Sequence, residues 1–162
     1  MTTPNPVDVP NFGALLGRYI GQVPPASVPR FLARLERGAA DRYRAWAAAL
    51  PDHAELLLSC AASEEQIAIR AEAIYPAIPE DLAAIEEALP GARDTYFAAF
   101  EGLSLKQQLA LQAAAERQGS QAWQGLKQEG LPAAHLSELD ALTALELESA
   151  DRVDELVAKL PD

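Results

Sequence analysis

Four glutamates carry side chains that could support chemistry, and each interrupts an otherwise apolar stripe of an expected helix. They are Glu36, Glu64, Glu116 and Glu146. Carboxylates buried together cannot all stay charged and dry, since the penalty is several kcal/mol per ion. The pattern therefore predicts a layer of carboxyl groups whose partner is a metal ion, an arginine, water or a proton.

The stripes follow from apolar residues at 3.6-residue spacing. Each glutamate lies roughly 13 to 15 residues from the turn of its hairpin, at about 1.5 Å per residue, so all four are expected near mid-height. The residues sharing the stripes are Leu32, Ala39, Tyr43, Trp46 and Leu50; Leu57, Ala61, Ile67, Ala71 and Ile74; Leu105, Leu109, Ala113, Ser120 and Trp123; and Leu139, Leu142, Ser149, Val153, Leu156 and Leu160.

The first two stripes belong to a pair of helices separated by almost no loop. One helix is expected over Val28–Leu50, with Ser27 as its cap and Pro51 ending it. The next opens on Asp52–Glu55, a variant of the capping box, and stops at Pro76. So short a connection forces an antiparallel hairpin.

The other two stripes predict a second hairpin. A capping box at Ser104–Gln107 opens a helix that is expected to end at Gly130, and Pro132 begins a helix that runs to Leu160. The hairpins are joined by residues 76–103, far longer than the roughly 2–8 residues that a simple up-down bundle needs. This crossover contains Pro90 and Gly91 and predicts two short helices, around 80–89 and 93–100.

This pattern resembles the ferritin-like superfamily of dimetal-carboxylate bundles over residues 29–160. Those proteins place one glutamate on each of two helices and a Glu-x-x-His motif on each of the other two. The resemblance implies an all-α, ferritin-like four-helix bundle of two antiparallel hairpins joined by one long crossover. Glu36 and Glu116 match the single glutamates, and Glu64 and Glu146 match the first residues of the motifs.

Both histidine positions of the motifs are empty. Ile67 and Ser149 stand there, and His53 and His135 lie near helix starts, about 15 Å or more away along the axis. The leading hypothesis is therefore a non-enzymatic binding or assembly module that has lost its metal site and has no cofactor. The alternative is an oxidoreductase or iron-handling protein with Fe or Mn at the four glutamates.

Without a metal, the glutamates would meet other partners. We expect a polar layer completed by water, Tyr43, Gln112 or arginines, the candidates being Arg37, Arg70, Arg117 and Arg152. A different register would turn Glu65, or the pair Glu148 and Asp151, inward as oxygen ligands for Mn, Mg or Ca. The favoured interpretation of that second set, which also includes Glu72, is a solvated face.

Composition excludes other classes. The formal charge of −11 argues against nucleic acid and anionic lipid, and no apolar run is long enough for a membrane span. Cys60 is the only cysteine and is expected in the core. The N-terminus has no signal-peptide pattern, and a reducing cytoplasmic setting is expected.

A Pro-rich N-terminal arm is expected over residues 1–28, with one short helix at most. Its apolar residues and an aromatic group in the crossover are expected to cover the bundle or to make a homodimer contact, and they motivate the hypothesis of a homodimer with a protein or small-molecule partner. These residues are Leu15, Leu16, Tyr19 and Ile20, and Tyr96, Phe97 and Phe100.

Overall fold

Helix-forming alanine and leucine dominate the chain, and the computed structural model, which describes residues 7–162, is accordingly all-α. Six α-helices and three short 3₁₀ turns account for its regular structure in that range, with no strand. None of the helices in the described part is long and apolar enough to cross a membrane. The all-α prediction is confirmed.

The N-terminal arm contains one short helix, α1 (Phe12–Ile20), as expected. Its N-cap is Asn11, whose side-chain oxygen accepts a hydrogen bond from the amide of Ala14 at 2.9 Å. The helix packs on α4 and touches α5. The arm thus lies across the chain's own helices; its residues 1–6 fall outside the described residues.

The first hairpin consists of α2 (Val28–Ala49) and α3 (Ala54–Ile74). Both predicted side-chain caps are wrong. The Ser27 hydroxyl donates instead to Asp81, at 2.6 Å, which ties the start of α2 to the crossover. Pro51–His53 forms a 3₁₀ turn, so α3 begins after Asp52 and has no side-chain cap.

The crossover is one continuous helix, α4 (Leu82–Ala98), preceded by the 3₁₀ turn Pro79–Asp81. The prediction of two short helices is wrong, because Pro90 is exposed and water can reach the carbonyl that it leaves unpaired. Gly91 has a packing reason, since a Cβ there would lie 2.5 Å from the ring of Tyr19 in α1.

The second hairpin consists of α5 (Leu105–Gln124) and α6 (Ala133–Lys159). The capping box between Ser104 and Gln107 is confirmed, with both reciprocal hydrogen bonds present. Helix α5 stops at Gln124, well before the expected Gly130. That glycine has φ +90° and serves the turn into α6 instead of ending α5.

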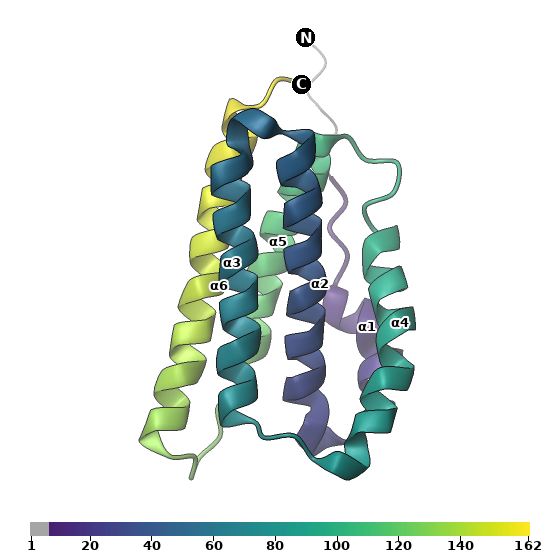
Figure 1. Ribbon diagram of the computed structural model, residues 1–162, viewed down its shortest axis with the longest axis vertical. Coiled ribbons are helices and arrows are strands. Elements are labelled where there is room, and N and C mark those ends of the chain that lie inside the picture. The colour runs from purple at the N-terminus through teal and green to yellow at the C-terminus, as the bar shows by residue number, and fades with distance from the viewer. Residues whose placement is uncertain (1–6) are drawn as a thin grey trace.

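The two hairpins meet mainly through α3 and α6 (Figure 1). On the other side, α4 runs back along α2, and α1 lies between α4 and α5 (Figure 1). The stripes face inward as predicted, and their mid-height residues are buried except Glu36, which is partly exposed. One apolar layer around Tyr43, Trp46 and Leu57 lies above the glutamates, and another around Ile67 and Leu139 lies below them.

The aromatic group of the crossover packs on residues of the same chain. The rings of Tyr96 and Phe12 lie 5.5 Å apart, and those of Phe100 and Trp46 lie 5.8 Å apart. This group and the arm therefore cover one side of the helices. The residues that motivated the homodimer hypothesis are largely engaged within the chain, and the homodimer itself stays a prediction.

Candidate metal centre

Three of the four glutamates come together at mid-height, one from each of α2, α3 and α6. Carboxylate oxygens of Glu36, Glu64 and Glu146 all lie within 4.8 Å of one another, and we call these residues the acidic triad. Glu116, from α5, is close enough for its charge to act on all three. The structure thus groups the residues that the stripes predicted.

Glu64 is the most isolated member of the triad. Its side chain is 0% exposed, and no N–H or O–H donor among the described residues reaches either carboxylate oxygen. Only the carboxyl of Glu36 lies within hydrogen-bonding reach, and that bond requires a proton on one of the two groups. A buried polar group without a partner costs about 1–3 kcal/mol, and more when it is charged. Such a group in a native fold calls for an explanation, and a bound ion or water molecule is among the usual ones.

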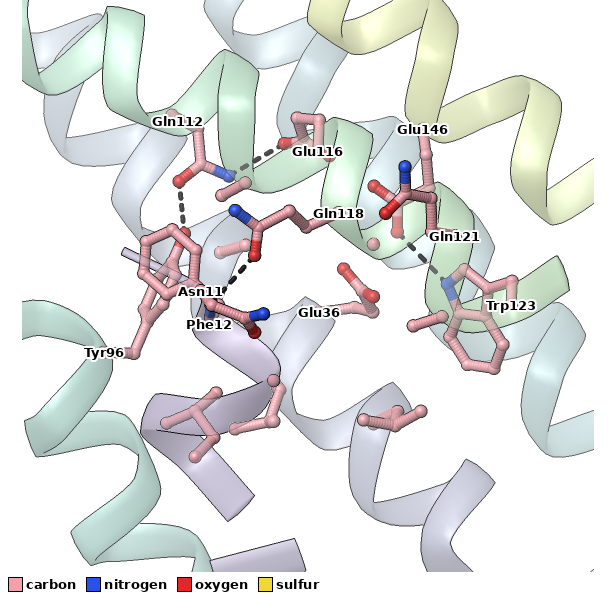
Figure 2. Close-up of a pocket in the computed structure, with 18 of the residues that line it drawn as sticks. Asn11, Phe12, Glu36, Tyr96, Gln112, Glu116, Gln118, Gln121, Trp123 and Glu146 are labelled. Carbon is pink, nitrogen blue, oxygen red and sulfur yellow. Dashed lines mark hydrogen bonds between the residues drawn. The ribbon is translucent and has the colours of Figure 1, made fainter. Parts of the chain in front are cut away.

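Glu116 is held differently, by two donors on one oxygen. The hydroxyl of Tyr43 donates to its Oε1 at 2.6 Å, and the side-chain amide of Gln112 donates to the same atom at 2.8 Å. Gln112 is itself oriented by the hydroxyl of Tyr96, which donates to its side-chain oxygen (Figure 2). This chain of bonds fixes the position of Glu116 and leaves its Oε2 unused.

Glu146 has one donor and an unusually close helix. The indole nitrogen of Trp123 donates to its Oε1 at 3.1 Å (Figure 2). Directly beside the carboxylate lies Gly119 of α5, where a Cβ would come within 2.8 Å of the same oxygen. Glycine at this position therefore makes the room in which the Glu146 carboxylate lies.

The pKa values of the triad are all raised, and burial is the main cause. For Glu64 the negative charges of Glu116, Glu146 and Glu36 raise the pKa further, and for Glu146 those of Glu36 and Glu116 do so. The pKa of Glu36 is raised by burial and by the charge of Glu116, against hydrogen bonds that lower it. Without a bound cation the triad therefore binds protons more readily than free carboxylates do, and a cation would compete with those protons.

The expected arginine partners are absent from this layer, so that prediction is wrong. Arg37 and Arg117 each follow an inner glutamate by one residue, which places them about 100° round the helix. All four candidate arginines pair with outward-facing acids: Arg37 with Glu65 and Glu72, Arg70 with Glu138, Arg117 with Asp151 and Asp154, and Arg152 with Glu148. No ion pair within residues 7–162 involves the four inner glutamates.

These ion pairs also exclude the alternative helix register, in which the second set of acids would face inward. Glu65, Glu148 and Asp151 face outward toward arginines, so the interpretation of a solvated face is confirmed. Neither histidine belongs to the acidic group: His53 lies in the turn after α2, and His135 packs edge-on against Tyr75, with ring centres 4.8 Å apart. The ligand set available at mid-height is therefore carboxylate oxygen.

A cavity of about 560 Å³ opens onto this centre from the side covered by α1. Glu36, Glu116 and Glu146 line it, whereas Glu64 does not (Figure 2). Leucines and alanines of α2 and α5, with Leu16 and Ile20 of α1, form much of the wall. A ligand in the cavity could thus reach the carboxylates without entering the apolar core.

Helix α1 is fixed over the cavity by a reciprocal contact. The amide of Phe12 donates to the side-chain oxygen of Gln118 at 2.8 Å, and the amide group of Gln118 donates to the carbonyl of Pro10 at 2.9 Å. The hydroxyl of Tyr19 also meets that of Thr95 in α4 at 3.0 Å. These polar contacts make α1 a well-defined wall.

Sequence reasoning missed Trp123 as a hydrogen-bond donor, Gly119 and Gln118. Trp123 belongs to the predicted stripe, but an aromatic residue at such a position is expected to pack in the core. Only the orientation of its ring in the structure shows that its indole N–H donates to Glu146. Gly119 did offer a signal, since a glycine in the middle of a predicted helix, three residues after Glu116, indicates a close approach. Tyr43 and Gln112, expected as partners, do contact Glu116.

No protein-family model, curated protein or solved structure matches this chain. What the centre does must therefore be inferred from its own chemistry.

Proposed function

We propose that this chain is a divalent-metal-binding protein with ferritin-like topology and that the acidic triad, with Glu116 beside it, holds the ion. The observation that carries the proposal is Glu64, fully buried with no donor at either oxygen and within 4.8 Å of two further carboxylates. A metal ion would supply the partner that Glu64 lacks and would bind all three carboxylates at once. The topology is supported by two antiparallel hairpins and by the helix α4, which returns along their length.

Carboxylate oxygen favours hard cations, which makes Mn²⁺ and Fe²⁺ our candidates among redox metals and leaves Mg²⁺ as a comparator. Glu36, Glu64 and Glu146 would be the ligands. Glu116, oriented by Tyr43 and Gln112, would bind a second ion or balance charge. When bound, the ion would supply Lewis-acid or redox chemistry at a position that the cavity can reach.

We place this proposal ahead of the lost-site hypothesis, which followed from the two missing histidines, because the arginines that could have neutralised metal-free glutamates lie elsewhere. Protonation is the remaining way in which the metal-free protein can keep the carboxyl groups of the triad buried. A non-enzymatic binding module stays as the second candidate, supported by the cavity of about 560 Å³, which falls in the size range of small-molecule sites.

Metal analysis of protein purified without chelator tests the proposal. We expect near-stoichiometric Mn or Fe in the wild-type protein and its loss in Glu64→Ala. The matched control is Glu65→Ala, which removes the neighbouring glutamate that faces arginines instead of the triad. Metal-free wild-type protein that also fails to bind added Mn²⁺ or Fe²⁺ would refute the proposal, and equal metal loss in both variants would move the site elsewhere.

A further inference from the structure

The cavity beside the triad combines apolar walls with one acidic end. Leu16, Ile20, Leu32 and Leu35 line it, and three inner glutamates border it. No lysine, arginine or histidine is among the described residues that line it. Even with one divalent ion bound, the four inner carboxylates would leave the polar end with a net negative charge, so the lining disfavours carboxylates and phosphates.

Charge balance indicates what the acidic end lacks. One divalent ion in the triad offsets two of the four carboxylate charges, and none of the described ion pairs supplies another cation. Glu116 receives both of its hydrogen bonds at Oε1. Its Oε2 therefore has no donor, and Glu36, a partly exposed residue, lines the cavity beside it.

We propose that the cavity binds a small primary aliphatic amine, with its ammonium group at Glu116 and Glu36 and its alkyl chain between α1 and α2. A primary ammonium group carries three donors and, like that of lysine, stays protonated near neutral pH. The alkyl chain gains by burial against the leucines of the wall. The inference rests on the proposed function only for the charge count.

The remaining polar groups of the wall fit this ligand better than a neutral polar one. The side chains of Asn11 and Gln118 are already committed to the start of α1. Gln112 is committed to Tyr96 and Glu116. Gln121 also lines the cavity, but it is exposed and uncharged. The carboxylates are thus the principal charged acceptors, and such acceptors recognise a donor-only head group.

Isothermal titration of manganese-loaded protein with n-hexylamine, n-hexanol and hexanoate tests the inference. We expect hexylamine to bind at least about 10-fold more tightly than hexanol and hexanoate not to bind. Glu116→Gln should weaken hexylamine binding by roughly 10-fold or more, the effect of losing a charged hydrogen bond. Ala115→Leu, which adds bulk to the cavity wall, should abolish it.

Manganese content measured on the same samples keeps the two proposals apart. Protein that binds manganese but not hexylamine overturns this inference alone. Hexylamine binding that both variants reduce, in protein that takes up no manganese, supports it and overturns the proposed function. Hexanoate binding as tight as that of hexylamine, or hexylamine binding that neither variant changes, also overturns it.

Discussion

Replacing Glu64 by leucine should stabilise the metal-free protein and abolish its stabilisation by metal. Leucine has nearly the volume of glutamate, and the side chain lies between the apolar layers that contain Leu57 and Ile67. The substitution removes two buried oxygens that no donor among the described residues reaches. It also removes the central ligand of the acidic triad.

The size of the effect follows from the cost of the orphaned group. A buried, unpartnered polar group costs about 1–3 kcal/mol, so Glu64→Leu should raise the free energy of unfolding by about 2 kcal/mol. For a chain of this length that corresponds to a rise in Tm of about 4–8 °C. Metal at about 100 times its Kd should stabilise the wild-type protein by about 2.7 kcal/mol and the variant hardly at all.

Thermal and urea unfolding with chelator, and again with Mn²⁺, measures both effects. Glu87→Leu is the control, because Glu87 is an exposed glutamate of α4 and its substitution should change stability little in either condition. Destabilisation of the chelated protein by Glu64→Leu, with Glu87→Leu neutral, would refute the reasoning. It would mean that the Glu64 carboxyl makes favourable interactions without metal.

Three further outcomes follow from the same geometry. Because burial raises the pKa of each triad carboxyl, the folded state binds extra protons at these three groups. In the metal-free protein their contribution to stability should be fully present below about pH 4.3 and should be lost as the pH rises through the raised values, a loss that Mn²⁺ should cancel in a Tm series across pH. Gly119→Ala should weaken metal binding by about 10–100-fold, as measured by titration with Mn²⁺, because the new Cβ displaces Glu146. Gly17→Ala is the control, since a Cβ there meets nothing within 4 Å and should leave Mn²⁺ binding unchanged. Gln118→Ala should accelerate hydrogen exchange in α1, because it removes the two hydrogen bonds between Gln118 and the start of that helix. Gln66→Ala, at an exposed position, should not. Unchanged protection of α1 in Gln118→Ala would contradict the inference that Gln118 holds the helix in place.

Much of the helical architecture could be predicted, because it depends on local signals. The capping box at Ser104 forms within one turn of the chain, and prolines mark the start of α2 at Val28 and of α6 after Pro132. Pro90 misled the prediction because its effect depends on the side of the helix that it occupies. On the exposed side of α4, water replaces the lost bond, and the helix continues.

The members of the candidate site could be predicted, but their partners only in part, since Tyr43 and Gln112 were expected and Trp123 was not. Helical spacing places Glu36, Glu64, Glu116 and Glu146 on inner faces whatever surrounds them. Which donors reach them depends on the rotation of each helix and on the rotamers at its surface. Arg37 illustrates this, since it adjoins an inner glutamate in the chain and yet pairs with Glu72 on the outside.

The amino-acid sequence alone determined that this protein has four long helices, each with one glutamate on its apolar stripe, because side-chain period and capping are properties of the local chain. Only the tertiary structure decided that three of these carboxylates meet within 4.8 Å, that Glu64 has no donor there, and that α1 walls a cavity opening onto the other three. The physical reason is that burial and pairing are properties of the space between helices. Residues far apart in the chain fill or leave open that space together.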